Sequence, residues 1–157
     1  MRNRYRIAVL VLTLVLLVPA AALAMDGFKA TLSGANENPP NPSPATGTGV
    51  FLFDGVNKLY YHISFSGLVA PQTASHIHRG AIAVNGPVIH NIGIGSPLDG
   101  IINLSAADVA DLLGGNYYYN VHSTTYPGGE IRGQLGADPT PARASTWGRI
   151  KALYREK

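Results

Sequence analysis

The histidines of this sequence have a spacing that is typical of metal binding. His76 and His78 are two residues apart in a segment of β character, so their side chains point to one face of the strand and can share one ion. His122 ends another such segment, and His90 lies in a segment between them. Imidazoles suit copper or zinc, and the Irving–Williams order favours copper. We therefore expect His76, His78 and His122 to be ligands, with His90 as a fourth.

The same residues also have a structural interpretation. A buried imidazole needs hydrogen-bond partners whether or not it binds metal. His76, His78 and His122 would then bond to one another, to Glu130 or to backbone groups beneath loops. The sequence leaves both interpretations open.

Glu130 and Arg132 are two residues apart on another expected strand and share its face. In a functional interpretation they lie beside the histidines, where Arg132 attracts an anion such as superoxide. In the structural interpretation, which we favour, they form an ion pair or anchor a loop. The sequence shows no phosphate-binding loop, no Ser-His-Asp order and no paired catalytic carboxylates. A non-enzymatic protein is therefore expected, and a copper-binding protein with redox or dismutase activity is the alternative.

Glycine and proline divide the chain into short runs with β character, and one segment has helical signals. Because several runs alternate apolar and polar residues, we predict an all-β fold: an antiparallel Greek-key β-sandwich, immunoglobulin-like or superoxide dismutase-like. The expected strands are 28–32, 49–54, 58–66, 74–79, 87–92, 100–104, 117–122 and 130–135. A helix is expected after Ser105, a good N-cap, and it should end at Gly114-Gly115.

The strand pattern also predicts which side chains are buried. Seven apolar residues should face the core: Ile63, Phe65, Ile77, Val88, Val121, Ile131 and Leu135. Three consecutive tyrosines, residues 117–119, alternate between the faces of one strand, so at least one ring should be partly exposed.

Residues 1–24 have the pattern of a secretory signal peptide. Arg2, Arg4 and Arg6 precede an apolar run that is too short to span a membrane, and Ala22-Leu23-Ala24 fits the cleavage site. We expect a secreted or periplasmic protein of bacterial type that begins at Met25 and has no transmembrane span. Once the signal is removed, acidic and basic residues are equal in number, so the pI of 9.3 does not indicate nucleic-acid binding.

The end of the chain differs in composition from the domain. Residues 137–145 contain two prolines and small polar residues, which predicts a linker. Residues 146–157 predict a basic amphipathic helix, in which Trp147, Ile150 and Tyr154 line one stripe. We expect this helix to be an interaction or sorting element that contacts a partner protein or a membrane surface.

Several motifs between residues 25 and 136 are shared with one domain family. They are Leu32-Ser33-Gly34 with Glu37-Asn38-Pro39-Pro40, His76-Ile77-His78-Arg79-Gly80, Asn85-Gly86-Pro87-Val88, and Tyr119-Asn120-Val121-His122 with Pro127-Gly128-Gly129-Glu130-Ile131-Arg132-Gly133-Gln134-Leu135. In these motifs the chain resembles the CHRD domain, first described in chordin and common in bacterial exported proteins. The resemblance implies a β-sandwich outside the cell, and with it a module that binds a protein, matrix material or a cell-surface component.

A partial resemblance to Cu/Zn superoxide dismutase rests on fewer residues. His76-Ile77-His78 and Val121-His122 are similar to the copper-binding segments of that sandwich, with His90 in a loosely similar place. The chain departs from that pattern because it lacks a cluster of histidines with aspartate for the zinc half and contains no cysteine.

Overall fold

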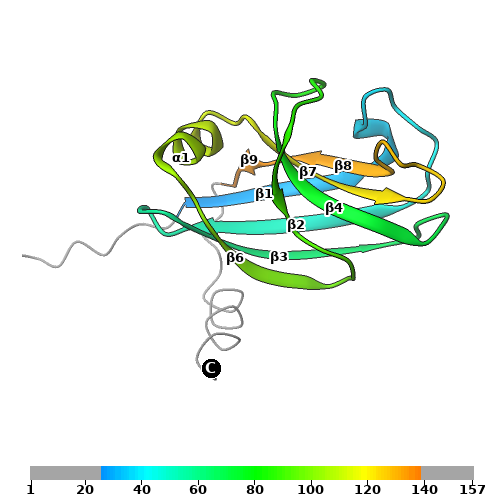
Figure 1. Cartoon of the computed structure of the whole chain (residues 1–157), viewed down its shortest axis with the longest axis horizontal. Helices are drawn as coiled ribbons and strands as arrows, with labels where there is room; N and C mark the ends of the chain where they lie inside the picture. Colours follow the sequence, from blue (N-terminus) through cyan, green and yellow to red (C-terminus); the bar gives the residue numbers. More distant parts are fainter. Residues whose placement is uncertain (1–25, 139–157) are drawn as a thin grey trace, which may run out of the picture.

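The computed structural model describes residues 26–138 (Figure 1). The expected signal peptide, the C-terminal helix and all but the first two residues of the expected linker therefore lie outside the described residues. Within the described range, no helix is long and apolar enough to cross a membrane.

Nine antiparallel strands, one α-helix and one 3-10 helix make up the described fold. The strands are β1 (Asp26–Ser33), β2 (Thr46–Phe53), β3 (Lys58–Ser66), β4 (Gln72–Arg79), β5 (Val88–Asn91), β6 (Leu98–Asn103), β7 (Tyr117–Ser123), β8 (Ile131–Gln134) and β9 (Gly136–Ala137). The helices are η1 (Gly34–Asn36) and α1 (Ala106–Leu113). Each of the eight expected strands has a counterpart, so the prediction of an all-β fold with one inserted helix is confirmed.

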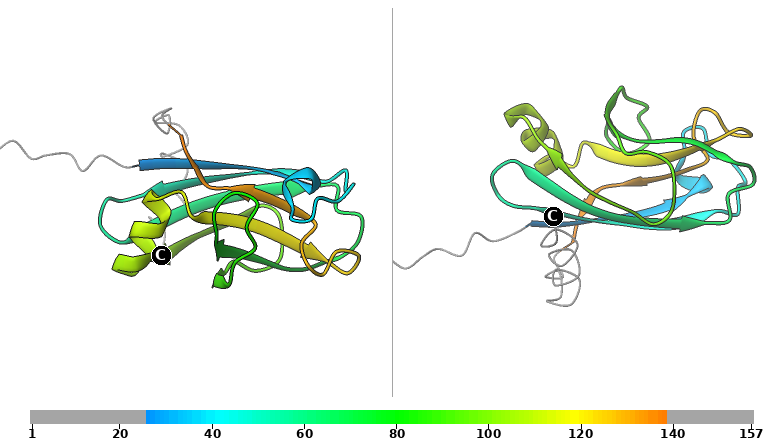
Figure 2. Two further views of the ribbon diagram at one scale, coloured as in Figure 1. Left: turned by 90° about the horizontal axis from the view of Figure 1, so that it is seen from above. Right: turned by 60° about the horizontal axis from the view of Figure 1, so that its bottom comes forward.

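All strands belong to one hydrogen-bonded sheet, whereas the sequence analysis expected two. Its order is β5-β4-β7-β8-β1-β2-β3-β6, and β9 pairs with β1. The two halves join because β1 pairs with β2 along its whole length and also with β8 and β9. The sheet folds over, so that β4 and β7 lie across β1, β2 and β3 (Figures 1 and 2). Its two edges, β5 and β6, are consecutive strands of the chain.

The apolar core lies between the two layers of this folded sheet. Strands β1 to β3 contribute Phe28, Leu32, Phe51, Leu59 and Ile63 to it. Ile77, Tyr119, Val121, Ile131 and Leu135 are among the buried residues of the other layer. The side chains of Ile63, Ile77, Val121, Ile131 and Leu135 are fully buried, as predicted. Phe65 is only partly buried and packs against the rim of the core.

Val88 is the one expected core residue that faces solvent, with 46% of its surface exposed. A β-bulge at Ile77/His78 shifts the register of β5, so that His90 pairs with Ile77 but Val88 pairs with His78. In β5, Ile89 packs against the core instead. One extra residue in a strand changes which side chains face inward, and the sequence pattern did not reveal it.

Helix α1 begins and ends as the sequence predicts. The Ser105 side chain accepts a hydrogen bond from the Asp108 backbone N–H, and the Asp108 carboxylate accepts from the Ser105 N–H, which makes a capping box. The chain leaves the helix at Gly114, and Gly115 has a φ of 72°, in the left-handed region that favours glycine. The sheet then continues through Ala137, the first residue of the expected linker, which pairs with Phe28.

Candidate metal centre

The pairing of β4 with β7 brings three histidines to the outer face of the sheet. His76 pairs with Asn120 and Ala74 pairs with His122, so that His76, His78 and His122 share one face. The residues between them, among them Ile77 and Val121, point into the core. The alternation that buries the apolar residues therefore also gathers the imidazoles.

The three imidazoles converge on one another. One ring nitrogen from each lies within 4.8 Å of the others, and Nδ1 of His76 is 3.1 Å from Nε2 of His122. Tetrahedral zinc sites have Zn–N bonds of about 2.0–2.1 Å, which place two ligand nitrogens little more than 3 Å apart. The ligand atoms need only small movements to hold one ion.

Two of the rings are oriented by backbone carbonyl groups. Nδ1 of His122 lies 3.0 Å from the Pro127 carbonyl oxygen, and Nδ1 of His78 lies 2.9 Å from that of Gly86. A carbonyl only accepts, so each Nδ1 carries the proton and each Nε2 keeps its lone pair when the ring is neutral. Metal-binding histidines typically have this outer hydrogen bond. Nε2 of His78 is buried and has no hydrogen-bond partner among residues 26–138.

The surroundings keep the three rings neutral. Burial lowers the pKa of His76, His78 and His122 below the ordinary value of 6.5, and neighbouring imidazoles lower the pKa of His76 and His122 further. A neutral imidazole is the form that binds a metal ion. His76 is the most accessible of the three, because His78 and His122 are only 8% and 9% exposed.

Tyr118 is buried against the cluster, although it points away from the core. The Arg132 guanidinium carbon lies 3.4 Å from the centre of its ring, and the His78 imidazole stacks on it with an interplanar angle of 8°. All three rings of residues 117–119 are therefore buried, contrary to our expectation of a partly exposed ring.

The structure does not bring His90 to the cluster. Its strand partner is Ile77, whose side chain points into the core, so His90 faces away from His76 and His78. It lies beside Tyr117 and is close enough to Asp108 for the carboxylate to raise its pKa against the lowering effect of burial. His62, the remaining histidine, is bonded to Asp99 across β3 and β6.

Glu130 and Arg132 both hold loops. The Glu130 carboxylate accepts hydrogen bonds from Ser43 Oγ and from the Val69 N–H. Arg132 donates to Asn85 Oδ1 and to the carbonyl oxygens of Ala81 and Val84 in the β4–β5 loop. Arg132 also packs on the ring of Tyr118, and the His78 imidazole stacks on that same ring.

Asn120 and Glu37 belong to this region but were missed as site residues. Asn120 is 2% exposed, and its Oδ1 lies 3.0 Å from Nε2 of His122. Its side chain also hydrogen-bonds to Glu37, whose pKa burial raises to about 7. A signal for both residues was present in the sequence. Glu37-Asn38 and Asn120 lie in the same group of shared motifs as His76, His78 and His122.

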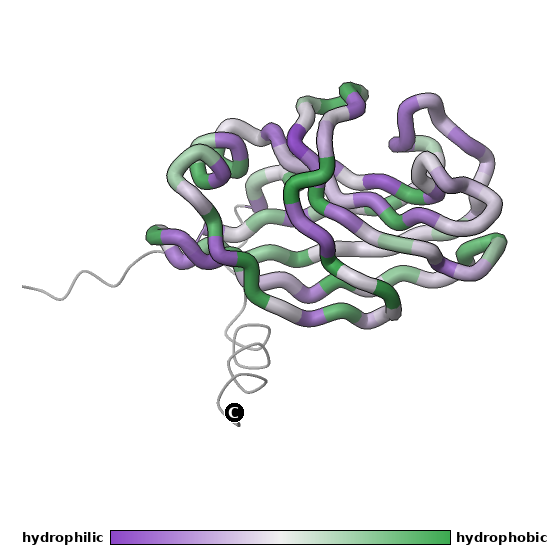
Figure 3. The backbone as a smooth tube through the Cα atoms, viewed as in Figure 1, coloured by the Kyte–Doolittle hydropathy of each residue, from purple (hydrophilic) through white to green (hydrophobic). Residues whose placement is uncertain are grey.

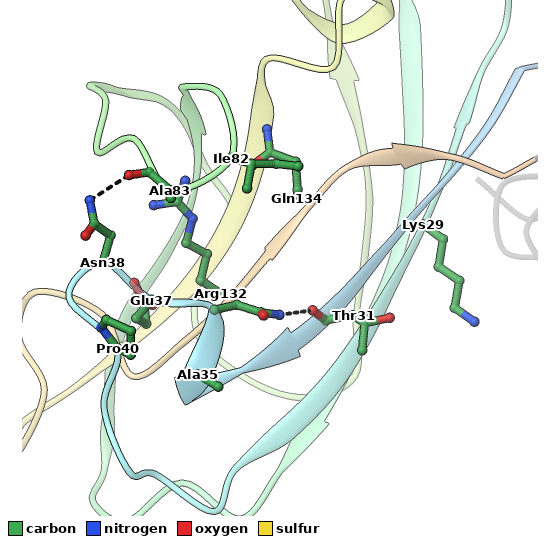
Figure 4. Close-up of a pocket in the computed structure, with 11 residues that line it drawn as sticks. Lys29, Thr31, Ala35, Glu37, Asn38, Pro40, Ile82, Ala83, Arg132 and Gln134 are labelled. Atoms are coloured by element: carbon green, nitrogen blue, oxygen red, sulfur yellow. Dashed lines mark hydrogen bonds between the residues drawn. The ribbon is translucent and has the colours of Figure 1, made fainter.

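Glu37 and Arg132 also line a cavity of about 490 Å³ between η1 and the β4–β5 loop (Figure 4). Its other walls come from β1 and β8, through Lys29, Thr31 and Gln134. Glu37 thus lines the cavity and also interacts with Asn120, which contacts the histidine cluster.

A comparison with protein families matches residues 28–135 to the CHRD domain. No curated protein and no solved structure gave a significant match. The match covers nearly all of the described sheet, including the three histidines, Asn120, Glu130 and Arg132. On this match, the chain belongs to the CHRD domain family.

Proposed function

We propose that this CHRD domain is a non-enzymatic module that works outside the cytoplasm and binds copper(II) or zinc through His76, His78 and His122. The observation that carries the proposal is the preset orientation of the rings. Backbone carbonyls hold the Nδ1 protons of His78 and His122, and this directs both Nε2 lone pairs into the cluster.

The donor atoms restrict the class of ion. Three imidazoles without a thiolate or thioether suit Zn(II) and Cu(II) better than Cu(I), which prefers sulfur. The chain has no cysteine, so no thiolate is offered to the ion, and we therefore propose Cu(II) and Zn(II) as the ions to test.

The test is metal binding by the purified mature protein. We expect about one equivalent of zinc or copper(II) per chain, measured by elemental analysis and by isothermal titration calorimetry, and loss of that equivalent in His122→Ala. His62→Ala is the matched control, because His62 is bonded to Asp99 and lies apart from the cluster. Less than a tenth of an equivalent in the wild type, without heat on titration, would overturn the proposal.

The β4–β5 loop favours a second function, the binding of another protein. Arg132 donates hydrogen bonds to the carbonyl oxygens of Ala81 and Val84 in this loop. Asn38 Nδ2 donates to the Ala83 carbonyl oxygen. The loop nevertheless presents apolar side chains to solvent, since Ile82 is 77% and Val84 is 52% exposed. It stands out from the sheet, with apolar residues at its tip (Figure 3). A rigid loop that displays apolar side chains is typical of a protein contact.

The partner would be an exported protein with an apolar pocket that accepts Ile82. We expect Ile82→Ser to abolish its capture from the native envelope or medium, and the captured protein must then bind the purified domain directly. Val56→Ser is the control, because Val56 is also exposed but lies on the β2–β3 turn. Equal capture by both variants would exclude this loop as the contact.

Export is tested on the native protein. Cleavage before Met25 should give a mature N-terminus that mass spectrometry finds in the periplasm or the medium. Recovery of the intact chain from the cytoplasm would contradict it.

A further inference from the structure

Asn120 lies where a fourth ligand of the cluster would be. It pairs with His76 across β4 and β7, is almost fully buried, and has its Oδ1 3.0 Å from Nε2 of His122. Because Nδ1 of His122 donates to Pro127, Nε2 of the neutral ring carries a lone pair. Two acceptor atoms therefore face each other at hydrogen-bond distance, an arrangement that a cation between them would stabilise.

Glu37 determines which end of the Asn120 amide faces the histidines. The carboxylate of Glu37 is an acceptor, and the Asn120 side chain hydrogen-bonds to it. When Glu37 is ionised it can only accept, so it bonds the NH₂ group of the amide and leaves Oδ1 facing the cluster, where it lies 3.0 Å from Nε2 of His122. Glu37 is itself held in place: it is 7% exposed, and its carboxylate fills the space that a side chain at Gly129 would occupy.

His78 repeats the pattern on the other side of Asn120. Its Nδ1 proton is held by the Gly86 carbonyl, its Nε2 is buried without a hydrogen-bond partner, and it interacts with the Asn120 side chain. The amide thus lies beside the Nε2 atoms of both His78 and His122. Nδ1 of His76 completes the group at 3.1 Å from Nε2 of His122.

We infer that Oδ1 of Asn120 is the fourth ligand of the metal site and that Glu37 is the positioning residue that directs it. The inference rests on the proposed metal-binding function and adds a property to it. Three imidazole nitrogens and one amide oxygen close a four-coordinate site, whereas catalytic sites keep one position for water or substrate. A site closed in this way resembles structural zinc sites, in which all four ligands come from the protein.

Cobalt(II) is the probe, because its visible spectrum reports coordination and it takes the place of zinc. We expect the cobalt-loaded mature wild type to show tetrahedral bands that do not change when azide is added. In Asn120→Ala the affinity for cobalt should fall at least tenfold, and azide should now shift the bands, because a position has opened. Asn120→Asp, which keeps an oxygen ligand, should remain insensitive to azide.

Glu37→Ala tests the positioning role. It should weaken cobalt binding about tenfold, at the lower end of the range known for outer partners of metal ligands. Asn103→Ala is the matched control, since Asn103 is exposed at the end of β6. Unchanged affinity in Glu37→Ala would remove Glu37 from the site and leave Asn120 as a ligand.

Failure of this inference differs from failure of the proposed function. Cobalt binding in the wild type with bands that shift on adding azide would show an open three-histidine site, which overturns the fourth ligand and keeps metal binding. Because this measurement uses the wild type, it decides even if Asn120→Ala does not fold. No binding of cobalt, zinc or copper by the wild type would overturn both.

Discussion

His78 and His90 lie on neighbouring strands, and each has a buried Nε2 without a hydrogen-bond partner, yet only His78 belongs to a cluster. The difference comes from register. His78 points to the outer face beside His76 and His122, whereas His90 pairs with Ile77 and faces the other side. The same residue type at a similar depth thus becomes a candidate ligand or an isolated ring according to which strand face it occupies.

The region around His78 and the region around His90 are also held by different arginines. Arg132, 2% exposed, stands beside the cluster and bonds three groups of the β4–β5 loop. Arg79, on the His90 side, forms ion pairs with Asp108 and Asp111, and its side chain is 43% exposed. Buried hydrogen bonds hold the surroundings of His78 in place, whereas ion pairs that solvent screens hold the surroundings of His90.

The largest expected difference is in metal affinity. His78→Ala should weaken zinc binding about a thousandfold, which corresponds to about 4 kcal/mol, because it removes one ligand. His90→Ala should leave the affinity within about threefold, or ~0.7 kcal/mol. Competition with a chelator of known affinity measures both. A comparable loss in the two variants would place His90 in the site and overturn the comparison.

The two arginines should differ in their effect on stability. Arg132→Ala removes three hydrogen bonds and the contact with Tyr118, and we expect a loss of about 3 kcal/mol in the free energy of unfolding. Arg79→Ala loses only exposed ion pairs and should cost about 1 kcal/mol or less. Urea denaturation of the metal-free proteins measures both. Equal losses would mean that the β4–β5 loop does not depend on Arg132.

In the metal-free protein, the histidines of both regions should lose their contribution to stability in acid, whereas Glu37, whose pKa burial raises to about 7, contributes with the opposite sign. Burial lowers the folded-state pKa of His78, His122 and His90, so the unfolded chain binds more protons at these residues as pH falls through 6.5. The histidine contribution to the free energy of unfolding therefore falls as pH drops below 6.5 and levels off below the folded pKa values. Saturating zinc should steepen this loss only through the cluster, since protons compete with the ion for its rings.

The variants separate the two contributions. His90→Gln should reduce the pH dependence by the same amount with and without zinc. His78→Gln should remove the extra dependence that zinc adds. Thermal unfolding between pH 5 and about 7.5, the range in which histidines titrate, measures these effects. An effect of His90→Gln that depends on zinc would contradict the assignment of His90 to a separate region.

Much of the fold and part of the site follow from local patterns. Alternation in β3, β4 and β7 predicts the burial of Ile63, Ile77 and Val121, and it also places His76 and His78 on one face. The helix follows from Ser105 and Asp108, whose capping box is a contact between residues three apart. Such features depend on near neighbours in the chain, and for this reason the sequence alone predicts them.

The remainder depends on contacts between distant segments. The bulge beside His78 exposes Val88 and turns His90 away, and nothing in the sequence of β5 signals it. Asn120 meets Glu37 because η1 packs against β8, the neighbour of β7 in the sheet, and Tyr118 is covered by Arg132 and His78. The single sheet likewise results from pairing of β1 with β8, which joins residues about a hundred positions apart.

Two neighbouring tyrosines give the smallest and most specific test. Tyr118 Oη accepts from the Gly86 N–H at 3.1 Å, and the Gly86 carbonyl holds Nδ1 of His78, so this hydroxyl supports a candidate ligand. Tyr117 Oη donates to Asp108 at 2.9 Å on the His90 side. Each Tyr→Phe change keeps the ring. Tyr117→Phe removes one hydrogen bond, and Tyr118→Phe removes two, of which the bond to the Gly86 carbonyl is long at 3.5 Å, so we expect each change to cost about 1 kcal/mol in stability. Only Tyr118→Phe should also weaken zinc binding, by a few-fold, because His78 loses part of its alignment.

Calorimetric zinc titration at fixed pH and temperature compares the two variants. If both variants bind zinc like the wild type, the Gly86 carbonyl holds His78 without help from Tyr118; if Tyr117→Phe weakens binding equally, the two regions are coupled and the register comparison fails.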